Sequence, residues 1–245
     1  MTGPDGRLRL WALVLDQAGG DPVEIGHVAT AAVDGAGVDA AAITVVLAAS
    51  PRENLYASGR MAVDMEELTT TLGEGPGCDA LAGDPALCAD LADPRSHRRW
   101  PFFAPAAVDA GVRAVFALPL RVGGIHLGVL DLYRAEPGPL GTDRLADALV
   151  LADTACALLL ETAGRPGPDP PDGAALLHPE VHQATGMIIG QAGVSAAVAL
   201  FRLRAYAYAH DHRLRDVAAR VVARRLRFLP GDGDAQEMEE AGSSR

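Results

Sequence analysis

Residues 115 to 133 read VFALPLRVGGIHLGVLDLY, and this stretch decides the fold class of the N-terminal part of the chain. Two apolar runs, 115–120 and 125–133, flank Gly123 and Gly124. A pair of glycines between apolar segments is typical of a tight β-hairpin. The pattern therefore predicts two adjacent antiparallel strands.

The segments on either side of this hairpin alternate between helix and strand patterns. The β-branched run 41–49 (AAITVVLAA) predicts a buried strand, and 54–58 predicts its hairpin partner across a turn at 50–52. Asp21 is expected to cap an earlier helix, and Thr142 to cap a long helix with apolar residues at helical spacing. The order helix, hairpin, helices, hairpin, helix predicts an α+β domain with an antiparallel sheet.

Charge is distributed unevenly along the 245 residues. The chain is 49% hydrophobic, which excludes disorder throughout, and its net charge is −11. Residues 178–230 nevertheless carry +5, whereas residues 1–177 carry −12 and the end from 231 carries −4. Because a partner responds to the local field, a nucleic acid would be expected to bind the 178–230 region.

The cysteines and the apolar segments indicate the compartment. Cys78, Cys88 and Cys156 are an odd number without CxxC spacing, so neither a disulfide framework nor a zinc site is expected. The N-terminus lacks an apolar segment of signal-peptide length, and the longest apolar stretch is interrupted by Asp147 and Asp153. We expect a cytoplasmic protein with no membrane span and no bound metal.

A proline-rich segment predicts the domain boundary. Residues 163–177, AGRPGPDPPDGAALL, contain four prolines and three glycines, which cannot continue a helix. We expect an α+β domain over 1–162, a linker over 163–177, a helical domain over 178–230 and an acidic disordered tail over 231–245.

The helical domain is expected to contain three short helices, EVHQATGMIIGQ, SAAVALFRLRAYAYAH and LRDVAARVVARRLRF, each with one apolar stripe. Gly193 separates the first two, and Ser195 is the expected N-cap of the second. The third places four arginines at intervals of seven, four and three, which predicts a basic ridge on one helix face: Arg213, Arg220, Arg224 and Arg227. An ordinary solvated helix surface is the alternative interpretation.

Four sequence segments in the N-terminal part together resemble the GAF family of small-molecule and cofactor sensors. They are LGEGPGCDAL (72–81), ALCADL (86–91), WPFFAPAAVDAGVRAVFALPL (100–120) and GGIHLGVLDLYR (123–134). They look like the GAF variant found ahead of RNA-binding modules in actinobacteria. The resemblance implies an antiparallel sheet with flanking helices and a pocket for a small-molecule ligand; the cofactor is unknown, and a nucleotide, haem or bilin stays open.

The C-terminal part resembles the ANTAR family, three-helix domains that bind paired RNA stem-loops and oppose transcription termination. The matching positions are Ala184, Gly186, Met187 to Ile189, Gly193, Ser195, Ala199, Leu203, Arg204, Leu214, Val217 and Ala218. Thr185 and Leu200 depart from the pattern, which has a basic residue and an aromatic there. A cation at the first position would contact phosphate, and an aromatic at the second would stack on a base.

These observations lead to one favoured function and one alternative. We expect an RNA-binding antitermination regulator that acts as a homodimer, with seven residues facing RNA: His182, Thr185, Arg204, Arg213, Arg220, Arg224 and Arg227. Cys78 follows the GEGPG turn, and a redox role is weighed there against simple packing. The alternative is a signalling scaffold whose degenerate ANTAR helices dimerise or bind protein. Enzyme activity is not expected, because no nucleophile elbow, HExxH or paired-carboxylate pattern occurs.

Overall fold

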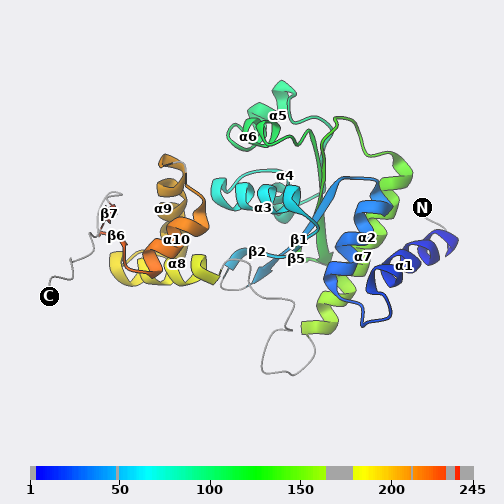
Figure 1. The fold of residues 1–245 in the computed structure, drawn as a ribbon, viewed down its shortest axis with the longest axis horizontal. Helices are drawn as coiled ribbons and strands as arrows, with labels where there is room; N and C mark the ends of the chain where they lie inside the picture. Colours follow the sequence, from blue (N-terminus) through cyan, green and yellow to red (C-terminus); the bar gives the residue numbers. More distant parts are fainter. Residues whose placement is uncertain (1–3, 48–49, 164–178, 211, 230–234, 238–245) are drawn as a thin grey trace. The chain divides into compact units, whose positions relative to one another are not determined.

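The structure is a computed structural model that describes residues 4–47, 50–163, 179–210, 212–229 and 235–237 (Figure 1). The chain divides into two compact units. The first comprises residues 1–69 and 74–177, and the second comprises 178–245 with the short segment 70–73. The predicted linker, apart from Ala163, lies outside the described residues.

A five-stranded sheet forms the centre of the first unit. Its strands are β1 (Ala40–Leu47), β2 (Ser50–Ala57), β3 (Ala86–Cys88), β4 (Ala114–Val122) and β5 (Ile125–Arg134). Their order is β2-β1-β5-β4-β3, and every neighbouring pair is antiparallel. Val122 pairs with Ile125 around the two glycines, which confirms the predicted hairpin. The predicted α+β class with an antiparallel sheet is also confirmed.

Two helices, α2 (Ile25–Ala36) and α7 (Thr142–Ala163), cover the first face of the sheet, and α1 (Pro4–Ala18) packs against these two helices (Figure 1). Apolar side chains of α1 and α2, such as Leu10 and Val28, pack with Leu151 of α7 and with Ile43 and Phe116 of the sheet. All five are almost completely buried. Since α7 offers a stripe of buried residues at helical spacing, its predicted amphipathic character is confirmed.

Short helices lie on the second face of the sheet (Figure 1). They are α3 (Arg60–Leu72), α4 (Pro76–Ala82), α5 (Pro94–Arg99) and α6 (Phe103–Asp109). The helix α4 packs on β3, β4 and β5, while α3 carries Met65 and Glu66 into the interior. This second face is where polar side chains become buried.

Two local expectations for the first unit were wrong. The predicted turn at 50–52 belongs to β2, because Ser50 already pairs with Leu47 of β1; residues 48–49 lie outside the described part. The cap of α2 is Glu24 and not Asp21. Glu24 accepts the backbone N–H of His27, while the His27 side chain accepts the backbone N–H of Glu24, which satisfies two N–H groups at once.

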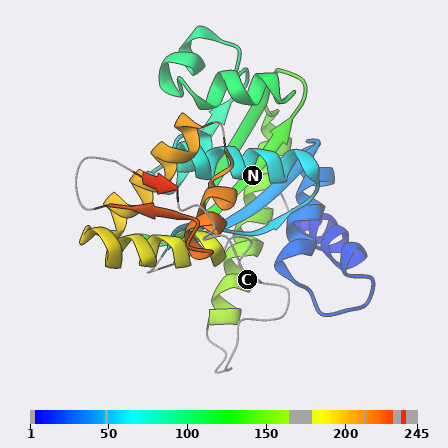
Figure 2. The same ribbon diagram turned by 60° about the vertical axis from the view of Figure 1, so that its left-hand side comes forward.

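The second unit contains three helices and a small ribbon of two strands (Figure 2). Its elements are α8 (Pro179–Ala192), α9 (Ala196–Ala209), α10 (Leu214–Val222), β6 (Leu226–Phe228) and β7 (Ala235–Glu237). Gly193 has φ 65°, and the Ser195 side chain accepts the Val198 N–H at 3.4 Å, as predicted for the break and the N-cap. The predicted stripes of the three helices meet in one buried core.

The third helix ends at Val222, earlier than predicted. The Arg224 N–H donates to the Val221 carbonyl at 2.9 Å and the Arg225 N–H to the Arg220 carbonyl at 2.8 Å, the two bonds of a Schellman motif. Arg224 takes the left-handed conformation, φ 59°, that glycine usually supplies at this position. The chain then continues as β6, which buries Leu226 and Phe228.

One part of the C-terminal tail differs from the prediction. Residues 235–237 form β7 and pair with β6, with Phe228 opposite Ala235, so this part of the predicted disordered tail is a strand. The pairing satisfies the backbone groups that β6 would otherwise leave exposed at an edge. Residues 231–234 and 238–245 of the predicted tail lie outside the described residues.

Within the described ranges, no single helix combines the length and apolar character needed to cross a membrane. The pair α8 and α9, bent by 109°, meets the length and composition criteria only when taken together.

Candidate functional site

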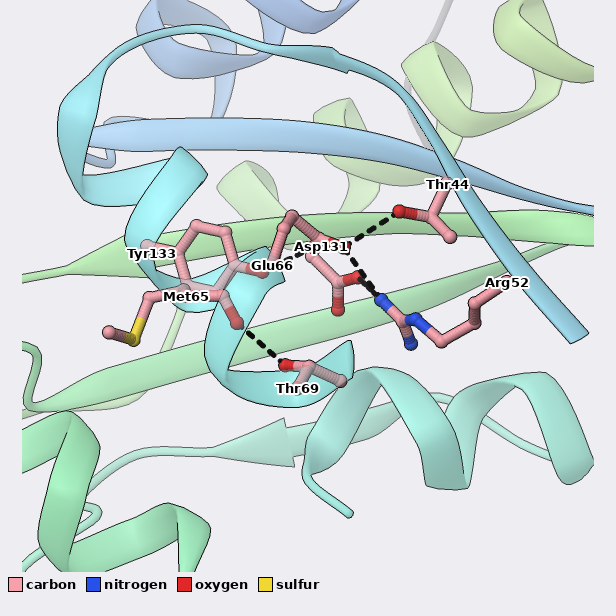
Figure 3. A network of polar contacts seen from close by, with 7 residues as sticks. All are labelled: Thr44, Arg52, Met65, Glu66, Thr69, Asp131 and Tyr133. Carbon is pink, nitrogen blue, oxygen red and sulfur yellow. Dashed lines mark hydrogen bonds and ion pairs between the residues drawn. The ribbon is translucent and has the colours of Figure 1, made fainter. Parts of the chain in front are cut away.

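A buried cluster of polar side chains lies on the second face of the sheet (Figure 3). Strands β1, β2 and β5 and helix α3 contribute its five members: Thr44, Arg52, Glu66, Asp131 and Tyr133. All are less than one-tenth exposed. Buried ionisable groups need partners, and these side chains supply them to one another.

Glu66 is the centre of the cluster. Its Oε2 accepts hydrogen bonds from Thr44 Oγ1 at 2.8 Å and from Arg52 Nη2 at 2.9 Å. Its Oε1 accepts one from the Tyr133 hydroxyl at 2.6 Å. Arg52 Nη2 also donates to Asp131 Oδ2 at 3.3 Å, so one guanidinium faces two carboxyl groups.

The two carboxyl groups titrate differently. Burial opposes ionisation of Glu66, but the charge of Arg52 and the hydrogen bonds from Tyr133, Thr44 and Arg52 lower its pKa overall. Burial, followed by the charge of Glu66, raises the pKa of Asp131 well above its ordinary value. The Glu66 carboxylate is therefore paired with Arg52, while burial and the nearby Glu66 charge make Asp131 harder to ionise than an ordinary aspartate.

Strand geometry and a glycine place these side chains together. Asp131 and Tyr133 are two residues apart on β5, so their side chains share one face of the sheet. Gly77, in α4, lies directly against the cluster. A Cβ on Gly77 would come within 2.7 Å of Asp131 Oδ1 and 2.8 Å of Arg52 Nη1. The GEGPG segment thus gives the cluster room as well as making a turn.

The sequence interpretation did not find this cluster. It placed Arg52 in a turn and gave no role to Glu66 or Asp131, which lie far apart in the sequence. The available signal was a charged residue inside an otherwise apolar strand, Asp131 within HLGVLDLY.

None of the three cysteines forms a disulfide bond. Cys78 is half-buried and directly follows Gly77, the residue that packs against the cluster. Burial raises the thiol pKa of Cys88 and of Cys156. No group of three or more His, Cys, Asp or Glu side chains that could hold a metal ion occurs in the described part of the chain.

The predicted RNA-facing residues are spread over several elements of the second unit. His182 and Thr185 are half-buried on α8, where Thr185 Oγ1 donates to the Val181 carbonyl at 2.7 Å. Arg204 is half-buried on α9, and Arg213 is the N-cap of α10. The prediction of a single helical ridge was wrong, because the chain leaves the helix before Arg224 and Arg227.

The C-terminal arginines are nevertheless close together in the sequence and exposed to solvent. Arg224, Arg225 and Arg227 are exposed in the turn after α10 and on β6, where the outward position alternates with the buried Leu226 and Phe228. Arg225 was not among the predicted site residues. Arg220 precedes them on α10, with its guanidinium 5.9 Å from the Tyr206 ring centroid.

Helix α9 shows what the departure at Leu200 means. The Leu200 side chain is only 9% exposed and belongs to the core of the second unit. The next residue, Phe201, is 70% exposed. Position 200 therefore faces inward, and leucine there removes no aromatic surface from the outside of this chain.

Comparison with known proteins identifies both units. The GAF domain model matches residues 25–163, more than half of the chain, and the ANTAR domain model matches residues 174–222. No significant match was found among curated proteins.

Solved structures show similarity to part of the chain. A GAF domain of a phosphoenolpyruvate-protein phosphotransferase from Coxiella burnetii is 15% identical with TM-score 0.48, covering 65% of this chain and 95% of that chain. A domain of a two-component sensor histidine kinase from Sinorhizobium meliloti is 16% identical with TM-score 0.44, and the match covers 56% of this chain and 88% of that chain. The chain belongs to the GAF family and carries an ANTAR domain after its GAF domain.

Proposed function

We propose that this protein is a signal-responsive RNA-binding regulator that acts by transcription antitermination. GAF and ANTAR are regulatory domains, the first a sensor and the second an RNA-binding module. In this proposal the GAF domain spans 1–162, the segment 163–177 links it to an RNA-binding domain over 178–230, and two copies of the chain act together on paired stem-loops in the cytoplasm.

The observation that carries this proposal is the basic surface of the ANTAR domain. Arg224, Arg225 and Arg227 are exposed within four consecutive positions, and residues 178–230 carry a net charge of +5 although the whole chain is acidic. A polyanion gains affinity from such a surface through release of its counterions.

The test is the salt dependence of RNA binding by the full-length chain. An Arg224→Ala/Arg227→Ala double variant is compared with an Arg95→Ala/Arg98→Ala double variant, whose two arginines are equally exposed in the GAF domain. Transcripts captured from the host by the wild type are sequenced, and the enriched stem-loops are then used as probes.

The first variant is expected to bind these stem-loops more weakly. The slope of log K against log salt should become shallower by roughly 0.7–0.9 for each phosphate that the variant no longer neutralises. The second variant should match the wild type. If the wild type captures no stem-loops and binds none at low salt, the proposed function is wrong.

A protein-binding scaffold is the second candidate. It is favoured by the large apolar side chains exposed on the ANTAR domain, among them Ile189 and Val198, and by the threonine at position 185 where the family pattern has a cation. Under this alternative the chain binds another protein or associates with itself. The two arginine variants then show the same weak, non-specific RNA binding.

For the sensor, we propose that the cluster around Glu66 is the part that responds to the signal. It holds the ionisable side chains that are most deeply buried among the described residues of the GAF domain, and half-buried Cys78 lies beside it. A change in its protonation or in the state of Cys78 would alter the balance of charge between Arg52 and the two carboxyl groups. Replacing Cys78 with serine and comparing RNA affinity under oxidising and reducing conditions tests the redox part.

A further inference from the structure

Helix α9 is apolar on its outer side as well as on its inner side. Its inward residues, including Leu200 and Leu203, fill the core of the ANTAR domain. On the outside, Phe201 is 70% and Tyr208 is 55% exposed. A helix that has already buried one apolar face gains nothing in stability from exposed aromatics on the other, so these side chains indicate a binding surface.

A groove of about 490 Å³ lies on this outer side. Its lining includes Val198, Phe201, Arg202, Tyr206 and His210, and two alanines of α9 lie between the larger side chains. Small residues between aromatic ones leave space for a flat ring.

The aromatic end of the groove is held in place before any ligand binds. The Tyr206 and His210 rings are stacked with centroids 3.9 Å apart and planes 19° apart. The Phe228 ring packs edge-on against Tyr206 at 5.9 Å, and Arg220 lies over the same ring. A platform fixed on several sides loses little side-chain entropy when another ring stacks on it.

The charge around the groove favours a nucleic acid over a second apolar surface. Arg202 lines the groove and donates to the Leu229 carbonyl at 3.1 Å, so the groove borders the end of β6, the strand that carries exposed Arg227. Residues 178–230 contain eight arginines and three acidic residues, Glu180, Asp211 and Asp216. Cations beside aromatic rings match the phosphates and bases of a single strand.

We infer that the groove on α9 binds an unpaired RNA base by stacking, with Phe201 as its exposed wall. The ligand class is a loop nucleotide of a stem-loop, whose base is unstacked and open to an aromatic side chain. The inference rests on the proposed function and adds to it a base contact distinct from the phosphate contacts of Arg224 and Arg227.

The test measures binding of full-length Phe201→Ala, Phe201→Trp and Phe102→Ala to a synthetic RNA of two hairpins with unpaired loops. Phe201→Ala is expected to bind roughly 5- to 150-fold more weakly, the range that the loss of one base stack represents. Phe201→Trp should retain affinity. Phe102→Ala removes another exposed phenylalanine, one that lies in the GAF domain outside the groove, and should change the affinity by less than about twofold.

Two further readouts separate stacking from other effects. The slope of log K against log salt should be the same for Phe201→Ala and the wild type, because Phe201 carries no charge that could neutralise a phosphate. An abasic nucleotide placed at each loop position in turn should, at one position, abolish the difference between them. Thermal unfolding should be unchanged, since Phe201 is exposed.

The outcomes distinguish this inference from the proposed function. If the wild type binds the RNA and Phe201→Ala binds equally well, only the groove assignment is wrong. If Phe201→Ala abolishes self-association in sedimentation experiments while RNA affinity per protomer is unchanged, the occupant is a second copy of the chain. If the wild type binds neither this RNA nor captured transcripts at low salt, both the proposed function and the groove assignment are wrong.

Discussion

Replacing Arg52 with methionine should strongly destabilise the GAF domain. Arg52 is the cation that faces Glu66 at 2.9 Å and Asp131 at 3.3 Å, and its side chain is almost fully buried. Methionine keeps much of the length of the side chain but removes the charge. The Glu66 carboxylate would then be buried without a counter-charge.

The magnitude follows from this uncompensated charge. Breaking a buried ion pair by removing one partner costs about 3–5 kcal/mol at neutral pH. The destabilisation should be smaller at pH 5, because without Arg52 the burial of Glu66 raises its folded-state pKa and protonation relieves the buried charge. A raised folded-state pKa means that stability is lost as the pH rises, at up to about 1.4 kcal/mol per pH unit.

Urea unfolding of the full-length chain, followed by tryptophan fluorescence, measures the effect in the correct domain. The chain has two tryptophans, Trp11 and Trp100, and both lie in the GAF unit. Arg60→Met is the matched control, since Arg60 pairs with Asp64 on the surface and its replacement should change the midpoint little.

A second variant tests the cause. Arg52→Met/Glu66→Gln removes both charges and should recover most of the stability lost in the single variant. A cost below about 1 kcal/mol for Arg52→Met, equal at pH 5 and pH 7, would refute the reasoning, because it would mean that the cluster holds no uncompensated carboxylate.

Three further outcomes follow from the same structure. Between pH 5 and pH 7, the free energy of unfolding of Asp131→Asn should rise relative to that of the wild type by up to about 1.4 kcal/mol per pH unit. The reason is that the pKa of Asp131 is raised in the folded wild type, so folding becomes less favourable as the unfolded chain releases this proton, and asparagine carries no such proton. A pH-independent difference in urea unfolding would contradict this. Arg224→Gly should stabilise the ANTAR domain by about 1 kcal/mol, since glycine takes positive φ without strain, while weakening RNA binding; circular dichroism melts and RNA titration check the two effects. Phe228→Ala should destabilise the same domain by about 3–5 kcal/mol, seen as early loss of its helical signal on heating, because it empties a fully buried aromatic site.

Much of the fold could be predicted because its patterns are local. The two glycines at 123–124 and the apolar runs beside them are enough for a hairpin, and Gly193 with Ser195 is enough for a break between two helices. The end of the third helix was not predictable in this way. Arg224 is not a residue type that normally takes positive φ, and the helical spacing of charges continues past the point where the helix stops.

The candidate RNA surface was predicted in composition but not in shape. The arginine-rich segment is visible in the sequence, and Arg224 and Arg227 are exposed as a binding role requires. Their arrangement depends on the turn into β6, which also exposes Arg225. Whether Leu200 or Phe201 faces solvent depends on how α9 is rotated about its axis within the domain. The sequence of the helix alone does not specify that rotation.

The sequence by itself determined the class of each unit, the hairpin, the helix starts at Ser195 and near Thr142, and the positive charge of the ANTAR region, because each depends on residues close together in the chain. Only the tertiary structure decided that Arg52, Glu66 and Asp131 share one buried cluster and that Phe201 stands outside the core. These features arise where strands and helices distant in the sequence pack together, and burial then sets the charge state and exposure of each side chain.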